Sequence, residues 1–119
     1  MLLLDYQYLF NFKEDMDMEN DTVLTNQTKL EIESMVFKRL VSHLQNRTDV
    51  QNIDLMNLSG FCRNCLSNWY MEASEEKGVK IDKENARELI YGMPHKIWKD
   101  KFQKDATPEQ VNKFDEKHK

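Results

Sequence analysis

The sequence predicts an all-α fold, in which five or six helices form a single compact multihelical domain. The chain has 119 residues, which is the usual size of one domain. It contains only three Gly and two Pro, fewer than the many tight turns of an all-β fold need. Helix start and stop signals recur from residue 25 onward, and no alternation of polar and apolar residues follows them.

The first 26 residues differ from the rest in charge. Their net charge is −5, whereas the net charge of the whole chain is −4, so residues 27–119 together carry +1. We therefore predict an acidic, poorly ordered leader at 1–26 and a helical domain at 27–119. The apolar start, MLLLDYQYLFNF, is either an extension upstream of a start at Met16 or Met18, or a segment that docks on a partner.

Charge and length also exclude several classes of partner. A domain so close to neutral does not have the basic surface that binds nucleic acid. The apolar start is too short to span a bilayer and lacks the basic region of a signal peptide, so we expect no membrane partner. Two cysteines three residues apart do not make a disulfide framework, which favours reduced thiols and a cytoplasmic location.

The first helix is predicted to begin at a capping box formed by Thr28 and Glu31 and to end near Arg47. Apolar residues recur every four positions along it, at Ile32, Val36, Leu40 and Leu44. A second capping box, formed by Thr48 and Gln51, is predicted to open the next helical segment.

The segment 49–77 reads as one kinked helix or two helices, with Gly60 as the predicted break and Gly78 as the stop. Ser59 or Asn57 is the predicted cap of its second half.

Three shorter helix signals follow. Asp82 caps the segment KENARELIY, and Gly92 stands where a left-handed residue ends that helix. Pro94 is predicted at the first position of the next helix, HKIWKDKF. Thr107 and Gln110 flank Pro108 in the strongest helix start of the chain.

The stretch GFCRNCLSNWY at 60–70 holds two cysteines at C-x-x-C spacing. On a helical wheel the cysteines share an apolar stripe, and the opposite side is polar. The stripe comprises Phe61, Cys62, Cys65, Leu66, Trp69, Tyr70 and Ala73, and the polar side Arg63, Asn64, Ser67, Asn68, Glu72 and Glu75. One interpretation is that both cysteines are small buried apolar residues.

Two other interpretations of the cysteine pair stay open. In a redox site, Cys62 would lie at the third helical position, where the helix dipole and Arg63 lower a thiol pKa. In a metal site, Cys62 and Cys65 would form half of a zinc site, because their spacing is that of a zinc ligand pair.

Polar side chains are unusually dense around the cysteines. Asn and Asp are poor residues for a helix interior because they compete for backbone hydrogen bonds. Their density predicts either a fixed polar network that caps and bridges helices or a ligand site, with Asp54, Asn57, Arg63 and Asn64 as candidates. The aromatic residues Trp69, Tyr70, Tyr91 and Trp98 are candidates for core or interface contacts.

The string DVQNIDLMNLSGFCRNCLSNWY and the later segments AREL, IYGMP and ATPEQ resemble a short bacterial family, the domain of unknown function 1244. The resemblance runs from about Thr28 to Phe114 and includes the helix around Trp98. It implies a small all-helical fold and does not imply a biochemical role.

We expect a small cytoplasmic binding or interaction module that self-associates as a homo-oligomer and is not catalytic. The sequence has no Ser-His-Asp order and no phosphate-binding loop. The alternative is a thiol-based redox or zinc-binding protein that uses Cys62 and Cys65. A small-molecule pocket under the polar cluster is a third possibility.

Overall fold

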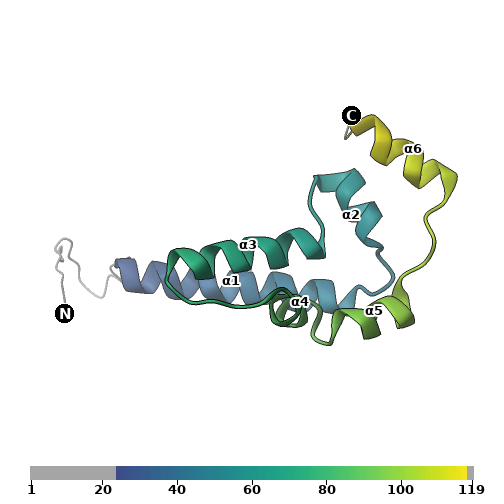
Figure 1. The fold of residues 1–119 in the computed structure, drawn as a ribbon. Coiled ribbons are helices and arrows are strands. Elements are labelled where there is room, and N and C mark those ends of the chain that lie inside the picture. The colour runs from purple at the N-terminus through teal and green to yellow at the C-terminus, as the bar shows by residue number, and fades with distance from the viewer. Residues whose placement is uncertain (1–23, 118–119) are drawn as a thin grey trace. The chain divides into compact units, whose positions relative to one another are not determined.

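The computed structural model describes residues 24–117, and within them it forms six helices and no strand (Figure 1). The predicted all-α fold is therefore confirmed. The chain divides after Leu40 into two compact units, so that the C-terminal end of α1 belongs to the second unit. The helices are α1 (Asn26–Asn46), α2 (Asn52–Ser59), α3 (Arg63–Glu76), α4 (Lys83–Tyr91), α5 (His95–Phe102) and α6 (Pro108–Lys117).

α1 begins earlier than the predicted capping box at Thr28 and Glu31. The hydroxyl of Thr25 accepts the backbone N–H of Thr28 at 3.0 Å, so Thr25 caps the helix. The same hydroxyl donates to Thr28 Oγ1 at 3.0 Å, which ties both threonines into one cap. The predicted leader lies outside the described residues, apart from 24–26.

The first unit leaves a row of large apolar side chains of α1 in solvent. We call Ile32, Met35 and Val36 the α1 apolar face. Their exposed fractions are 47%, 70% and 63%. The apolar residues that predicted this helix are therefore buried only near its C-terminal end, at Val41 and Leu44.

The core of the second unit forms where α3 packs against α4 and α4 packs against α5. Ala86, Ile90 and Trp98 are almost completely removed from water there. Burying an apolar side chain as large as these last two contributes about 1.5–3 kcal/mol. Further buried apolar side chains come from the end of α1 and from α3 and its start, namely Val41, Leu44, Cys62 and Leu66.

The starts of α2 and α3 differ from their predicted caps. Asp54 accepts the N–H of Gln51 at 3.2 Å, so the box that opens α2 lies three residues later than the predicted one. Ser59 donates back to the carbonyl of Leu55 and does not cap α3. Cys62 occupies that N-cap position, with an extended backbone.

The later helix signals agree closely with the structure. The side chain of Asp82 accepts the N–H of Asn85 at 2.8 Å, as an N-cap does. Thr107 and Gln110 exchange hydrogen bonds in a capping box at the start of α6. Pro94 differs slightly, because it is the N-cap of α5 and not its first residue.

Two features of the structure require glycine at position 92, its left-handed backbone and the close approach of Gln45. It ends α4 in the left-handed region, with φ of 77°, and its N–H donates to Glu88 O. A Cβ at this position would lie 2.9 Å from Cδ of Gln45. Gln45 occupies that space because its Nε2 donates to the carbonyl of Ile90 at 3.1 Å, which satisfies a C-terminal carbonyl of α4.

Replacing Gly92 with Ala should destabilise the protein more than replacing Gly78 with Ala. Gly78 has nearly the same φ, 75°, but a Cβ there would meet no atom within 4 Å. We expect Gly78→Ala to cost about 1 kcal/mol from backbone strain alone. Gly92→Ala should cost about 1 kcal/mol more, because Gln45 loses its bond to Ile90. Urea denaturation measures both, and equal costs would contradict this role of Gln45.

Candidate functional site

Arg63, the first residue of α3, is the most deeply buried charged side chain of the second unit. It is 1% exposed, although the helical wheel placed it on the polar side. Its guanidinium donates four hydrogen bonds. The acceptors are Val50 O and Asn52 Oδ1 at 2.9 Å each, Arg47 O at 2.8 Å and Leu44 O at 3.4 Å. We call this arrangement the Arg63 clamp.

The clamp places a cation where backbone dipoles favour it. Leu44 O lies in the last turn of α1 and Arg47 O directly after it, where the helix dipole carries partial negative charge. Each carbonyl also accepts a backbone N–H, from Arg47 and Val50 respectively, both at 3.1 Å. The guanidinium also lies 4.8 Å from the ring centroid of Trp98, within cation–π range. Burial lowers the pKa of Arg63, but a guanidinium keeps its charge at neutral pH. The clamp therefore joins the end of α1 to α3 and α5.

A chain of hydrogen bonds continues from the clamp to α4. Asn52 accepts from Arg63 and donates through Nδ2 to the Tyr91 hydroxyl at 3.0 Å. The Tyr91 hydroxyl in turn donates to Asn64 Oδ1 at 2.8 Å. Burial raises the pKa of Tyr91, so this hydroxyl stays a donor well above neutral pH. These contacts favour the interpretation of the polar run as a fixed network.

Tyr91 also lies in an aromatic cluster between α4 and α5. Its ring centroid is 5.0 Å from that of Trp98 and 4.9 Å from that of His95. Nδ1 of His95 lies 3.2 Å from Nη1 of Arg87, which can only donate, so the proton of the neutral ring is on Nε2. Burial and the charge of Arg87 lower the pKa of His95 and keep it neutral at pH 7.

The two cysteines lie beside a third sulfur atom. Cys62 is buried and Cys65 is half-buried, with 3.9 Å between their sulfur atoms. Cys65 Sγ is also 3.9 Å from Sδ of Met56, on α2. Burial raises the pKa of Cys62, whereas the redox interpretation expected it to be lowered. Cys62 is therefore protonated at pH 7, which does not favour a role for it as an activated nucleophile.

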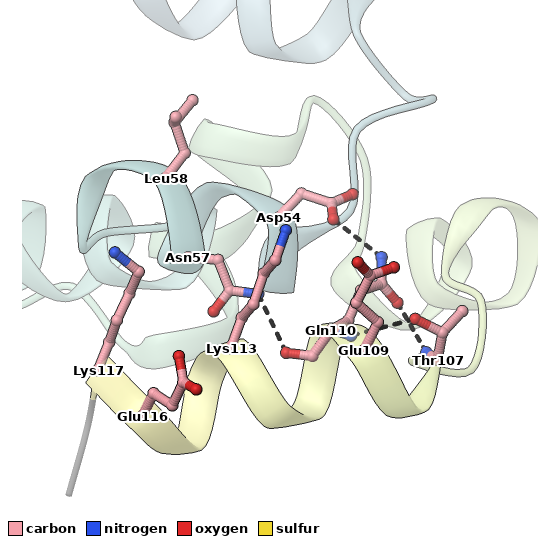
Figure 2. A pocket seen from close by; sticks show the side chains of 9 residues that line it. All are labelled: Asp54, Asn57, Leu58, Thr107, Glu109, Gln110, Lys113, Glu116 and Lys117. Atoms are coloured by element: carbon pink, nitrogen blue, oxygen red, sulfur yellow. Dashed lines mark hydrogen bonds between the residues drawn. The ribbon is translucent and has the colours of Figure 1, made fainter.

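A polar cleft of about 680 Å³ lies between α2 and α6 (Figure 2). Asp54 Oδ1 accepts from Nε2 of Gln110 at 2.8 Å, and Asn57 donates to the carbonyl of Gln110 at 3.1 Å. Lys113 and Lys117 rise from α6 along the same cleft. Asn57 Oδ1 is buried without a partner among the described residues. Asp54 and Asn57 thus hold α6 against α2. Neither side chain is among the hydrogen-bond acceptors of the Arg63 clamp.

Two of the predicted aromatic candidates, Trp69 and Tyr70, both lie on α3. Trp69 is 51% exposed, and its ring centroid lies 5.9 Å from that of Phe61. Tyr70 is half-buried.

Ser67 was assigned to the polar side of the helical wheel, but it is fully buried. Its hydroxyl donates to Asn64 O at 2.7 Å, so burial leaves no polar atom of this side chain unpaired.

Sequence reasoning missed two residues that organise the site. Gln51 is buried and pairs with the chain after α5, donating to Phe102 O at 2.9 Å and accepting from Lys104 N at 2.8 Å. No local pattern distinguishes this glutamine from a surface one. Met56 was not singled out because its contact with Cys65 depends on how α2 and α3 pack.

The fold and the site define a small all-α protein whose second unit is organised around a buried polar network. A family model described as "Protein of unknown function (DUF1244)" matches residues 50–116. The chain belongs to this family, which confirms the resemblance seen in the sequence. None of the curated proteins compared with the chain matches it. Within residues 24–117, no helix combines the length and the apolar character needed to cross a membrane.

Replacing Arg63 with Lys should destabilise the protein strongly. A lysine keeps the charge but cannot reach four acceptors with a planar fork. Val50 O and Asn52 Oδ1 would lose their Arg63 donor, and Leu44 O and Arg47 O would keep only a backbone N–H, so we expect a cost of about 2–4 kcal/mol. Arg47→Lys is the control, because the side chain of Arg47 pairs with Asp49 at the surface and its substitution should change stability little. Chemical denaturation compares the two, and similar costs would contradict a special role for Arg63.

Tyr91 should make the protein sensitive to alkali. Its folded-state pKa is raised, so its contribution is complete below the unfolded pKa of about 10 and is lost as pH rises through the higher folded value. Tyr91→Phe should cost about 1–2 kcal/mol at pH 7 through the two lost hydrogen bonds. The difference between wild type and variant should shrink above about pH 10. Urea midpoints from pH 7 to 11 test this, and a constant difference would contradict it.

Proposed function

We propose that this protein is a homodimeric helical interaction module, in which two copies pair through the α1 apolar face. The exposure of Ile32, Met35 and Val36 on one side of α1 is the observation that supports this proposal. Exposed apolar side chains that are grouped on one surface are typical of interaction sites.

Physical chemistry favours a covered α1. Most of the stability of a helix in a protein comes from packing of its apolar side rather than from its own hydrogen bonds. A facing helix would remove the α1 apolar face from water. Each large side chain buried in this way would contribute about 1.5–3 kcal/mol.

Charge along α1 favours a second copy as the facing helix. Glu31, Met35 and Arg39 are spaced four residues apart and lie on one row of the helix. An antiparallel pair with its two-fold axis at Met35 would place Glu31 of each copy opposite Arg39 of the other. Such a contact is self-complementary, as a two-fold interface requires. Exposed ion pairs contribute little affinity, so their role would be to fix direction and register.

The double substitution Met35→Glu and Val36→Glu should convert a wild-type dimer into a monomer, because it places four carboxylates in the dimer interface. The matched control is Leu58→Glu on α2, which replaces an apolar side chain that is 85% exposed and should leave the dimer intact. Sedimentation velocity over a hundred-fold range of concentration measures the association. A wild-type chain that stays monomeric, or a dimer that survives the double substitution, would overturn the proposal.

Charge exchange tests the antiparallel arrangement separately. Glu31→Arg alone and Arg39→Glu alone should each weaken the dimer, since each places like charges opposite one another. The two substitutions together restore opposite charges and should restore the wild-type dissociation constant within a few-fold. A double variant weaker than both single variants would exclude this register.

A further inference from the structure

We propose that Cys62, Cys65 and Met56 form a binding site for a monovalent soft metal ion, with Cu(I) as the physiological candidate. Two thiols and a thioether, from two helices joined by a short turn, gather their sulfur atoms around Cys65. The inference does not depend on the proposed dimer, because all three residues belong to the second unit.

The distances between the sulfur atoms are those of ligands that share one ion. Cys65 Sγ lies 3.9 Å from Cys62 Sγ and 3.9 Å from Met56 Sδ. Sulfur ligands at about 2.3 Å from a metal ion lie about 3.8 Å apart across it. Each of these two pairs is therefore already spaced as two ligands of one ion, with Cys65 shared between them. Cys65 is half-buried, which leaves the cluster accessible from solvent.

The type of ligand selects the ion. Thiolate and thioether sulfur favour Cu(I), whereas a structural Zn(II) site takes four ligands that are thiolate, imidazole or carboxylate. Within residues 24–117, no group of three His, Cys, Asp or Glu side chains could hold a metal ion. Met56 is thus the residue that distinguishes the proposed site from the zinc half-site that the cysteine spacing suggested.

The charges around the cluster fit the complex that would form. Binding replaces two thiol protons, which leave to solvent, with one Cu(I), so the site changes from neutral to −1. Cys62 is the N-cap of α3, where the helix dipole stabilises negative charge. Arg63 is adjacent, and each of its hydrogen-bond acceptors is a neutral oxygen. A copper dithiolate would supply a negative charge beside that buried cation.

Anaerobic titration of the reduced full-length chain with the acetonitrile complex of Cu(I) tests the site. The readout is the ultraviolet thiolate-to-copper charge-transfer band, with the chelator bathocuproine disulfonate as competitor. We expect one Cu(I) per chain, retained against the chelator. Cys62→Ser and Cys65→Ser should each weaken retention at least about a hundred-fold, because one of two thiolates is lost.

Met56→Leu is the decisive variant, because it removes the third sulfur atom and nearly conserves volume, so the fold should be kept. We expect its affinity for Cu(I) to fall about ten-fold, with X-ray absorption detecting two sulfur ligands in place of three. The control is Met35→Leu, which removes an exposed thioether on α1 and should bind as wild type does. Wild-type chain that loses Cu(I) to the chelator or prefers Zn(II), or Met56→Leu that binds as tightly as wild type, would overturn the proposal.

Discussion

The packing of the second unit depends on one buried guanidinium, that of Arg63, which donates two hydrogen bonds from each of its amino groups. Arg63 lies at the N-terminus of α3 and donates to carbonyls at the C-terminal end of α1, so one side chain connects the end of one helix to the start of another. Its other amino group binds Val50 in the loop before α2 and Asn52, the first residue of α2. A neutral side chain could not offer so many donors, and a lysine could not offer them in one plane.

The remaining contacts of this unit extend from the clamp in a fixed order. Asn52 donates to the Tyr91 hydroxyl and so connects the clamp to α4. The ring of Tyr91 packs against Trp98 of α5, which lies over the guanidinium. α6 is attached differently. It has no buried residue and is held to α2 by hydrogen bonds of Asp54 and Asn57 with Gln110. Because such bonds each contribute only about 1 kcal/mol net, α6 depends on the correct placement of α2 more than on apolar burial.

Local signals predicted the helix ends at Asp82, Gly92 and Thr107, but equally local signals at Thr28, Thr48 and Ser59 marked the wrong residues. Asp82, Gly92 and the Thr107 box act within three or four residues of the backbone groups that they satisfy, so their chemistry is visible in the sequence. The environment of Arg63 was not predictable, because a helical wheel assigns charged residues to water and cannot see acceptors eleven to nineteen residues away. The sulfur cluster was half predictable: the cysteine spacing is local, whereas the approach of Met56 requires the packing of two helices.

The two residues between the cysteines explain why the sulfur atoms are held in place. In Cys62-Arg63-Asn64-Cys65, the inner pair is committed to the buried network, Arg63 to the end of α1 and Asn64 to the Tyr91 hydroxyl. These bonds fix the first turn of α3, so the flanking thiols need no disulfide to be positioned. A dithiol that is already oriented loses little conformational freedom when it binds a ligand. The low entropic cost allows a site with few ligating groups to bind tightly. The same polar network that stabilises the fold therefore also preorganises the sulfur cluster.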